Sequence, residues 1–266
     1  MPLVHCFYTM VIAFLLCFEQ ISAACKTAIV DQSGHADFST IQSAIDSVPS
    51  NNVDWYCINV NPGTYREKVK IPRDKPFILL KGSGQKKTMV VWNEPYLHDA
   101  TFSSFAYNIV VTSMSFINSH WGPGSKHAKA PAVAAMECYI EGAVDFIFGN
   151  GQSIYKDCSI RYLGEMLPPG LASFITAQAR NDPDEPTGFV FKNCNIYGKG
   201  ATLECLETCW QRFTFAEYNF GPGADTSKRV KWMKNLDPQT LANLTSMSFI
   251  NSDGWRQSMP QPLEYI

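Results

Sequence analysis

Short runs of alternating apolar and polar residues, each closed by Gly, Asn, Asp or Pro, recur along most of the chain. Examples are WYCINVNPGTY, FILLKGSG, TMVVW, NIVVTSMSFINS and GFVFKNCNIYGKG. Runs of this length and spacing are typical of β-strands. One stretch, DFSTIQSAIDSVP from Asp37 to Pro49, instead places its apolar residues at helical spacing and ends on proline. The chain is therefore predicted to be an all-β protein with one short N-terminal helix.

Three of the strand-like segments share the pattern Cys-x-Ile, at Cys138–Ile140, Cys158–Ile160 and Cys194–Ile196. Their separations of 20 and 36 residues leave loops of different length between the copies. A short strand repeated in this way suits a parallel β-helix, in which each coil stacks on the next. The Cys and Ile of each copy would both point inward and stack as buried hydrophobes. On pattern alone, a β-sandwich or barrel remains the alternative.

The nine cysteines raise two other readings, a disulfide framework and a metal cluster. Removal of a leader ending near Ala24 would take away Cys6 and Cys17 and leave seven, an odd number that argues against complete pairing. A metal cluster is disfavoured because no Cys-x-x-Cys pair occurs, and Cys205 with Cys209 has no matching histidines. We therefore expect no metal and no other cofactor.

The N-terminus carries an apolar stretch from Met10 to Phe18, then a polar break, then small residues up to Ala24. This order is typical of a secretory signal peptide, so we predict that residues 1–24 are removed and that 25–266 form one domain. The usual Lys or Arg is missing ahead of the apolar stretch, and a buried N-terminal strand or helix is the alternative. The stretch is too short to span a bilayer.

Two further properties bear on where and on what the protein acts. The formal charge is −2, with 22 basic and 24 acidic residues, which favours neither nucleic acid nor an anionic membrane as a partner. This weak charge is compatible with a neutral or partly esterified polymer. The tripeptide Asn243-Leu-Thr245 is an acceptor for N-glycosylation and fits export from the cell.

One acid interrupts the apolar segment EGAVDFIFGNGQSIY, which extends from Glu141 to Tyr155. This acid, Asp145, stands between Val144 and Phe146, where a carboxylate costs free energy unless it is paired, hydrogen-bonded or used. No histidine stands beside a Gly-x-Ser-x-Gly turn or an active-site Cys signature, which disfavours a Ser-His-Asp hydrolase. Asp145 is thus either a satisfied structural acid or a catalytic carboxylate tuned by its apolar surroundings.

The segment GAVDFIFGNGQSIY resembles the active-site segment of plant pectinesterases (pectin methylesterases). Four other blocks resemble that family in the same order: DQSGHADFSTIQSAIDSVP, NPGTYREKVKIP, ITAQAR and FAEYNFGPGADTSKRVKW. The resemblance extends from about Ile29 to Trp255. It implies a right-handed parallel β-helix that is secreted to the cell wall and hydrolyses methyl-esterified galacturonate in pectin to pectate and methanol. Pectin is the expected partner, and an inhibitor protein is a further candidate.

The resemblance also implies roles for single residues. Asp145 matches the family's aspartate nucleophile, which attacks the ester carbonyl to form an acyl-enzyme anhydride. Thr101 matches a position that contacts substrate, although a lone Thr is otherwise simply a good β-former. Gln178 and Arg180 lie in a retained block and are expected to line the groove or to support the site. Aromatic residues such as Tyr107, Phe174 and Trp232 are candidates to stack on sugar rings, or else belong to the core.

Two motifs of the family are missing from this chain. The Gln-Asp-Thr motif, which supplies the acid, is absent, and we infer that more than one coil is lost between Met136 and Cys138. The Leu-Gly-Arg-Pro-Trp motif is replaced by ECLETCWQR, from Glu204 to Arg212. Glu141 is a candidate to replace the lost acid, and Arg212 with Trp210 to replace the Arg and Trp. Many family members also carry glutamine where this chain has Pro131.

These gaps leave several functions open. An active pectinesterase is one, and a catalytically impaired family member that still binds pectin is the alternative. A third possibility is that the two junctions are artefacts of a mis-spliced or frame-shifted gene model. Glycosidase or lyase chemistry is disfavoured, because glycosidases need paired carboxylates and no second acid can be placed beside Asp145 from the sequence.

Overall fold

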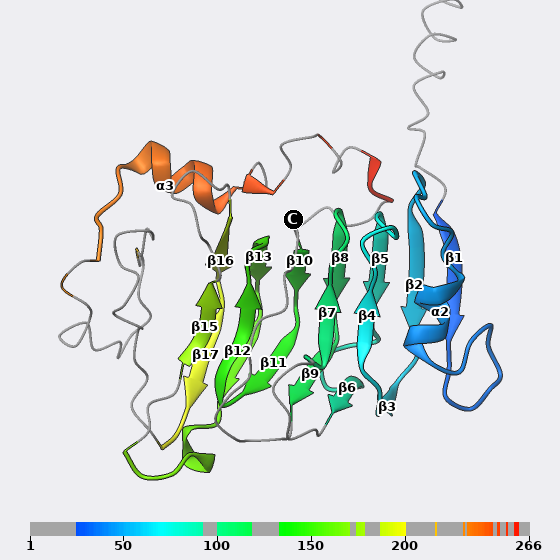
Figure 1. Ribbon diagram of the computed structural model, residues 1–266, viewed down its shortest axis with the longest axis horizontal. Coiled ribbons are helices and arrows are strands. Elements are labelled where there is room, and N and C mark those ends of the chain that lie inside the picture. Colours follow the sequence, from blue (N-terminus) through cyan, green and yellow to red (C-terminus); the bar gives the residue numbers. More distant parts are fainter. Residues whose placement is uncertain are drawn as a thin grey trace, which may run out of the picture.

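The computed structural model describes residues 25–92, 100–118, 133–170, 174–178, 187–200, 216, 231, 233–246, 249–250, 254 and 258–260. Within these residues, successive coils of the chain stack their strands into parallel sheets (Figure 1). The arrangement is a parallel β-helix, as the repeating strands predicted. The predicted signal peptide, residues 1–24, lies outside the described residues, and no helix within them is long and apolar enough to cross a membrane.

Most coils contribute one strand to each of two large sheets, which have seven and six strands. The first sheet consists, in spatial order, of β1 (Lys26–Val30), β2 (Tyr56–Val60), β5 (Ile78–Lys81), β8 (Ile109–Thr112), β10 (Val133–Met136), β13 (Gln152–Lys156) and β16 (Gly188–Lys192). The second consists of β17 (Asn195–Gly198), β14 (Ser159–Tyr162), β11 (Tyr139–Gly142), β9 (Ser115–Asn118), β6 (Thr88–Trp92) and β3 (Gly63–Tyr65). On a third face, β4 (Val69–Ile71) pairs with β7 (Phe102–Ser104), and β12 (Val144–Gly149) pairs with β15 (Phe174–Gln178).

The Cys-x-Ile segments form the corners between the first and second sheets. The residue before each cysteine is left-handed: Glu137 (φ 50°), Asp157 (φ 53°) and Asn193 (φ 54°). The three cysteines then stack from coil to coil as free thiols, and Cys138 and Cys158 are buried. Each sulfur lies near the carbonyl oxygen of an equivalent residue one coil earlier: Val111 at 3.7 Å, Ala135 at 3.5 Å and Tyr155 at 3.3 Å. The predicted burial is therefore confirmed for Cys138 and Cys158, but in the last copy Cys194 is only partly buried and Ile196 is 44% exposed.

The predicted N-terminal helix is α2 (Ile41–Ser47), which packs against β1, β2 and β4 at one end of the β-helix (Figure 1). Glu67 accepts hydrogen bonds from the backbone N–H groups of Ile41 and Gln42, both at 2.9 Å. At the other end, the ammonium of Lys75 donates to the carbonyl oxygens of Ile45, Asp46 and Val48. An anion at the N-terminus and a cation at the C-terminus both stabilise a helix of this polarity.

Two features at the C-terminal side were not predicted from the sequence. Helix α3 (Pro238–Thr245) begins at Asp237, whose carboxylate accepts from the N–H of Thr240 at 2.9 Å. Beyond it, two short segments, residues 249–250 and 258–260, pack against the first sheet, and we call them the C-terminal strap. Ile250 and Met259 of the strap belong to a buried apolar cluster with Trp55, Cys57, Leu79, Val110, Met136 and Ile154. The indole N–H of Trp55 donates to Ser258 at 3.2 Å.

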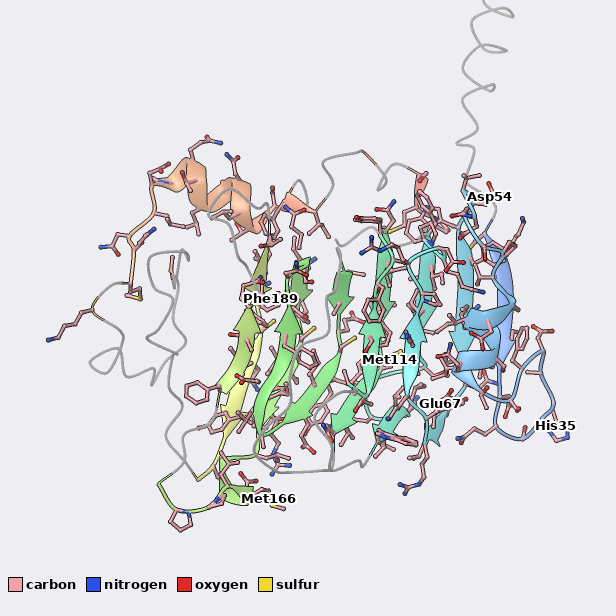
Figure 2. The ribbon with its side chains drawn as sticks, in the orientation of Figure 1. His35, Asp54, Glu67, Met114, Met166 and Phe189 are labelled. Atoms are coloured by element: carbon pink, nitrogen blue, oxygen red, sulfur yellow. A yellow bond between two sulfur atoms is a disulfide. The ribbon has the colours of Figure 1, made fainter. Side chains whose placement is uncertain are left out.

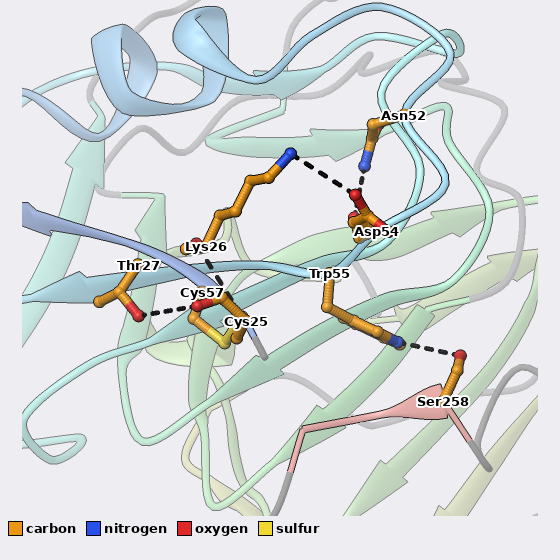
Figure 3. Close-up of a disulfide and its surroundings, with 8 residues drawn as sticks. All are labelled: Cys25, Lys26, Thr27, Asn52, Asp54, Trp55, Cys57 and Ser258. Carbon is orange, nitrogen blue, oxygen red and sulfur yellow. Dashed lines mark hydrogen bonds and ion pairs between the residues drawn. A yellow bond between two sulfur atoms is a disulfide. The ribbon is translucent and has the colours of Figure 1, made fainter. Parts of the chain in front are cut away.

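A disulfide joins Cys25 to Cys57, and so ties the start of β1 to its neighbour β2 (Figure 3). The pairing was not predicted, because the odd cysteine count argued only against complete pairing. Lys26 and Tyr56, next to the two cysteines, are register partners in the parallel pair β1–β2, and so are Thr27 and Cys57. The bond therefore closes a covalent loop around the residues that form α2.

The junction at Met136 and Cys138 lies within a coil that is paired on both sides. Strand β10 pairs with β8 and β13, and β11 pairs with β9 and β14, each without a register shift. Loss of part of a coil would leave unpaired strand edges at this point. The continuous register is what a loss of whole coils would produce, since each coil of such a stack contacts mainly its neighbours.

A cluster around Asp31, just after β1, predicts a pH effect on stability. The carboxylate of Asp31 accepts from the Ser33 hydroxyl (2.6 Å), the Ser33 N–H (2.8 Å) and the amide of Asn61 (3.0 Å), which lowers its pKa from 3.8 to about 2. A pKa below that of the unfolded chain means that the stabilisation is present above about pH 4 and is lost as the pH falls towards 2.

We expect the urea midpoint of the parent to fall more between pH 5 and pH 2.5 than that of Asp31→Asn, which lacks the titrating group. Asp54→Asn is the matched control, because the carboxylate of Asp54 (Figure 2) makes an exposed ion pair with Lys26, and this variant should behave like the parent. Equal decreases in the parent and in Asp31→Asn would contradict the prediction.

Candidate active site

Asp145 occupies an irregular position in β12, on the third face of the β-helix. The register between β12 and β15 shifts there: Val144 pairs with Phe174, but Ile147 pairs with Thr176. Asp145 and Phe146 together therefore stand opposite the single residue Ile175, which is a β-bulge. The φ angle of Asp145 is 51°, in the left-handed region that non-glycine residues rarely adopt. Bulges and such backbone conformations are concentrated near functional sites.

The surroundings of Asp145 are apolar on the core side. Ile147 is buried in the main hydrophobic core, and Phe146 and Ile175 pack against that core. The Oδ1 atom of Asp145 is buried, although the residue as a whole is only partly so. The carboxylate thus lies at the boundary between the core and the surface.

Gly142 provides the space that the bulge requires. A Cβ atom at this position would lie 2.4 Å from Cβ and 2.5 Å from Cγ of Phe146, closer than real contacts allow. Phe146 is the residue next to Asp145 in the bulge, so its ring is seated against the backbone of Gly142. This contact explains the glycine in EGAVDF, because a larger residue would displace Phe146, the neighbour of Asp145 in the bulge.

We expect Gly142→Ala to lower the free energy of unfolding by about 1–3 kcal/mol, because overpacking displaces the Phe146 ring. The same displacement should disturb Asp145 and reduce any esterase activity. Gly188→Ala in β16 is the matched control, since a Cβ there meets only the tip of Phe249 at 3.4 Å. Denaturant unfolding of the two variants is the measurement, and equal stabilities would contradict the prediction.

Gln178 ends β15 and pairs with Gly149 at the far end of β12. It is three residues beyond Ile175, which places it about 10 Å along the strand from Asp145. Both amide atoms of Gln178 are buried and have no hydrogen-bond partner, and the same holds for the hydroxyl of Thr187. Such buried, unpaired polar atoms cost free energy and often belong to functional residues. The structure therefore places Gln178 on β15, the strand that pairs with β12, but three residues along from the position opposite Asp145.

The other predicted site residues lie at different distances from Asp145. Thr101 precedes β7 and is only 7% exposed, and its hydroxyl donates to the carbonyl oxygen of Ile117 at 3.4 Å. It lies two coils from β12, or about 10 Å. Phe174 is paired with Val144, next to Asp145, whereas Tyr107 is 56% exposed after β7. Positions outside the described residues are Arg180, Pro131, Trp210, Arg212 and Trp232.

Glu141, the candidate replacement acid, is engaged on the second sheet. Its carboxylate accepts hydrogen bonds from the Tyr139 hydroxyl and from Arg161 Nη1, the latter at 2.8 Å. Arg161 is its register partner in β14 and also pairs with Glu165 at 2.6 Å. Burial and the Glu141 carboxylate raise the pKa of the Tyr139 hydroxyl. Glu141 is therefore engaged by Tyr139 and Arg161 on the second sheet, whereas Asp145 lies on the third face.

The described strands of the third face contain no acid other than Asp145. Nor do the described residues gather three or more His, Cys, Asp or Glu side chains where they would hold a metal ion. The chemistry that this part of the molecule can offer is therefore that of one carboxylate on a rigid strand. Fold and site together define a class: parallel β-helix proteins that carry an aspartate at a bulge in a strand of one face.

Comparison with known proteins narrows this class to a family. The Pectinesterase family model matches residues 27–137 and 133–212, so the chain belongs to the pectinesterase family of carboxylic-ester hydrolases. Probable pectinesterase 29 of Arabidopsis thaliana is 40% identical over 305 aligned positions, which cover 89% of this chain and 90% of that protein. The resemblance predicted from the five sequence blocks is confirmed.

Solved structures agree on the fold. A pectin methylesterase from carrot matches with a TM-score of 0.66 and 21% identity, covering 89% of this chain and 97% of that one. A pectin methylesterase in complex with a hexasaccharide matches with a TM-score of 0.58 and 18% identity, covering 90% of this chain and all of that one. The predicted parallel β-helix is confirmed.

The comparisons also locate the gaps. The two family matches meet at residues 133–137, where the sequence indicated missing coils, and the second ends at residue 212, the end of ECLETCWQR. In the alignment with Probable pectinesterase 29, 89% of 266 residues is about 237, against 305 aligned positions. About 68 positions of that alignment therefore hold no residue of this chain.

Proposed function

We propose that the protein is a secreted pectinesterase that hydrolyses methyl esters of galacturonate in cell-wall pectin to pectate and methanol, with Asp145 as the nucleophile. The observation that carries the proposal is the geometry of Asp145: a left-handed aspartate in a β-bulge, with one oxygen buried, on an outer face. Membership of the pectinesterase family supports the substrate class. A structurally similar pectin methylesterase in complex with a hexasaccharide supports a polymeric partner.

In the proposed reaction, a carboxylate oxygen of Asp145 attacks the carbonyl carbon of the methyl ester. The bond from that carbon to the methoxy oxygen breaks, and the methoxy oxygen takes a proton from solvent water and leaves as methanol. Water then hydrolyses the resulting anhydride. This restores the Asp145 carboxylate, frees the carboxylate of the galacturonate unit and returns protons to the solvent. Gln178, Thr101 and Arg180 are proposed to contact neighbouring sugars or to support the groove, since the first two lie about 10 Å from Asp145.

A second candidate function is pectin binding with little or no catalysis. It is favoured by the divided family match and by the described strands of the third face, which contain no acid besides Asp145. Glu141, the candidate replacement, is paired with Arg161 on the second sheet. Loss of a general acid costs about 10²–10⁴-fold in rate. A chain of this kind would bind pectin and release methanol slowly or not at all.

Methanol release from highly methylated pectin, measured beside affinity for the same pectin, separates the two candidates. Release by the purified, folded protein supports the esterase. Binding without release supports the impaired family member. A folded protein that neither binds pectin nor releases methanol would overturn both.

A further inference from the structure

Helix α3 carries the one Asn-x-Ser/Thr tripeptide of the whole sequence, at Asn243-Leu-Thr245. Asn243 is exposed, in the last turn of the helix. The helix packs against β16 of the first sheet, and the Lys192 ammonium at the end of β16 donates to the carbonyl oxygen of Thr245 at 3.3 Å. Asn243 thus lies on an element that packs on the first sheet, whereas Asp145 lies on the third face (Figure 1).

The folded helix engages the groups that a glycosylating enzyme must reach. The side-chain oxygen of Asn243 accepts from the amide of Gln239 at 3.0 Å. The hydroxyl of Thr245 donates to the carbonyl oxygen of Leu241 at 2.8 Å. An eight-residue helix is marginal in isolation, so residues 238–245 become helical only when they can pack against β16. Before that point the acceptor tripeptide is open to modification.

We infer that Asn243 is an N-glycosylation site, and that the glycan is attached before α3 folds onto β16. The donor is an oligosaccharide joined to a lipid through a diphosphate. The Asn243 amide nitrogen forms a bond to C1 of the first sugar, the bond from C1 to the diphosphate breaks, and the nitrogen loses one proton. The inference rests on the proposed export of the chain and is independent of catalysis by Asp145.

The test expresses residues 25–266 behind an established secretory leader in a eukaryotic cell, so that entry into the secretory pathway does not depend on residues 1–24. The molecular mass of the secreted protein is measured by mass spectrometry before and after treatment with an endoglycosidase that removes N-glycans. We expect the parent and Thr245→Ser to lose the mass of one oligosaccharide, and Thr245→Ala and Asn243→Gln to lose none. Thr240→Ala, in the same helix but outside the tripeptide, is the matched control and should behave like the parent.

The timing is tested with a purified oligosaccharyltransferase and its lipid-linked donor. We expect it to modify a peptide covering residues 237–247 and to leave the folded, unglycosylated full chain unmodified. A secreted parent with no glycan would overturn the site. Equal modification of peptide and folded chain would overturn the proposed order of events. Methanol release is measured on the same samples, so that failure of the proposed esterase activity is seen separately.

Discussion

Replacement of Asp145 by asparagine is expected to reduce methanol release from methylated pectin by about 10³-fold or more, because removal of a catalytic nucleophile leaves only binding and residual stabilisation of the transition state. The variant should remain folded, with a free energy of unfolding within about 0.5 kcal/mol of the parent. The reason is conformational: asparagine, like aspartate, tolerates the left-handed backbone that Asp145 adopts at φ 51°. Alanine would add backbone strain to the loss of the carboxylate.

Asp157→Asn is the matched control for this experiment. Asp157 is also left-handed, at φ 53°, but it is exposed at the corner before Cys158. The same chemical change in the same backbone conformation should therefore leave methanol release unchanged. Parental release by Asp145→Asn would contradict Asp145 as the nucleophile. Loss of release in both variants would point to a general effect of the substitution on the fold.

Removal of the Cys25–Cys57 disulfide is expected to lower the free energy of unfolding by about 3–4 kcal/mol. The estimate follows from the entropy of closing a loop between cysteines 32 residues apart. The double variant Cys25→Ser/Cys57→Ser should unfold at a lower guanidinium concentration than the parent. A loss of this size is a large share of the stability of an ordinary domain.

Cys194→Ser provides the comparison at a free thiol, since Cys194 is unpaired and only partly buried. It should cost much less than the double variant. A reducing agent should lower the unfolding midpoint of the parent and of Cys194→Ser, and should leave the double variant unchanged. A double variant as stable as the parent would show that the disulfide contributes nothing measurable.

Much of the fold could be predicted because its signals are local and repeat. The stacking of Cys138 and Cys158 follows from alternating burial, and α2 follows from helical spacing closed by Pro49. Helix α3 was missed because none of its residues is buried, so it has no apolar stripe to reveal it. Its capping residue Asp237, followed by proline, was the signal available. The partner of Cys25 depends on the register of β1 against β2, which no local pattern specifies.

The candidate site, like the fold, was predictable in part. Asp145 could be identified because an acid in an apolar run is unusual and because the surrounding segment resembles a known motif. Its bulge could not, since the bulge exists only relative to the register of β15. In the same register Gln178 pairs with Gly149 and not with Asp145. This separation cannot be seen from the identities of the two residues. Gly142 was visible in the sequence, but its role depends on the close approach of the Phe146 side chain.

The C-terminal strap affects how the stack of coils comes apart. Coils of a parallel β-helix contact mainly their neighbours, so the end of such a stack can fray without disturbing the rest. Here the indole N–H of Trp55, just before β2, donates a hydrogen bond to Ser258, 203 residues away in sequence. Ile250 and Met259 of the strap also belong to one buried cluster with residues of β5, β8, β10 and β13. Fraying at the α2 end must first release the strap, which couples the second strand of the first sheet to residues near position 258. We therefore expect one cooperative unfolding transition, with closure of the strap as a late, slow event in folding because of its large loop entropy.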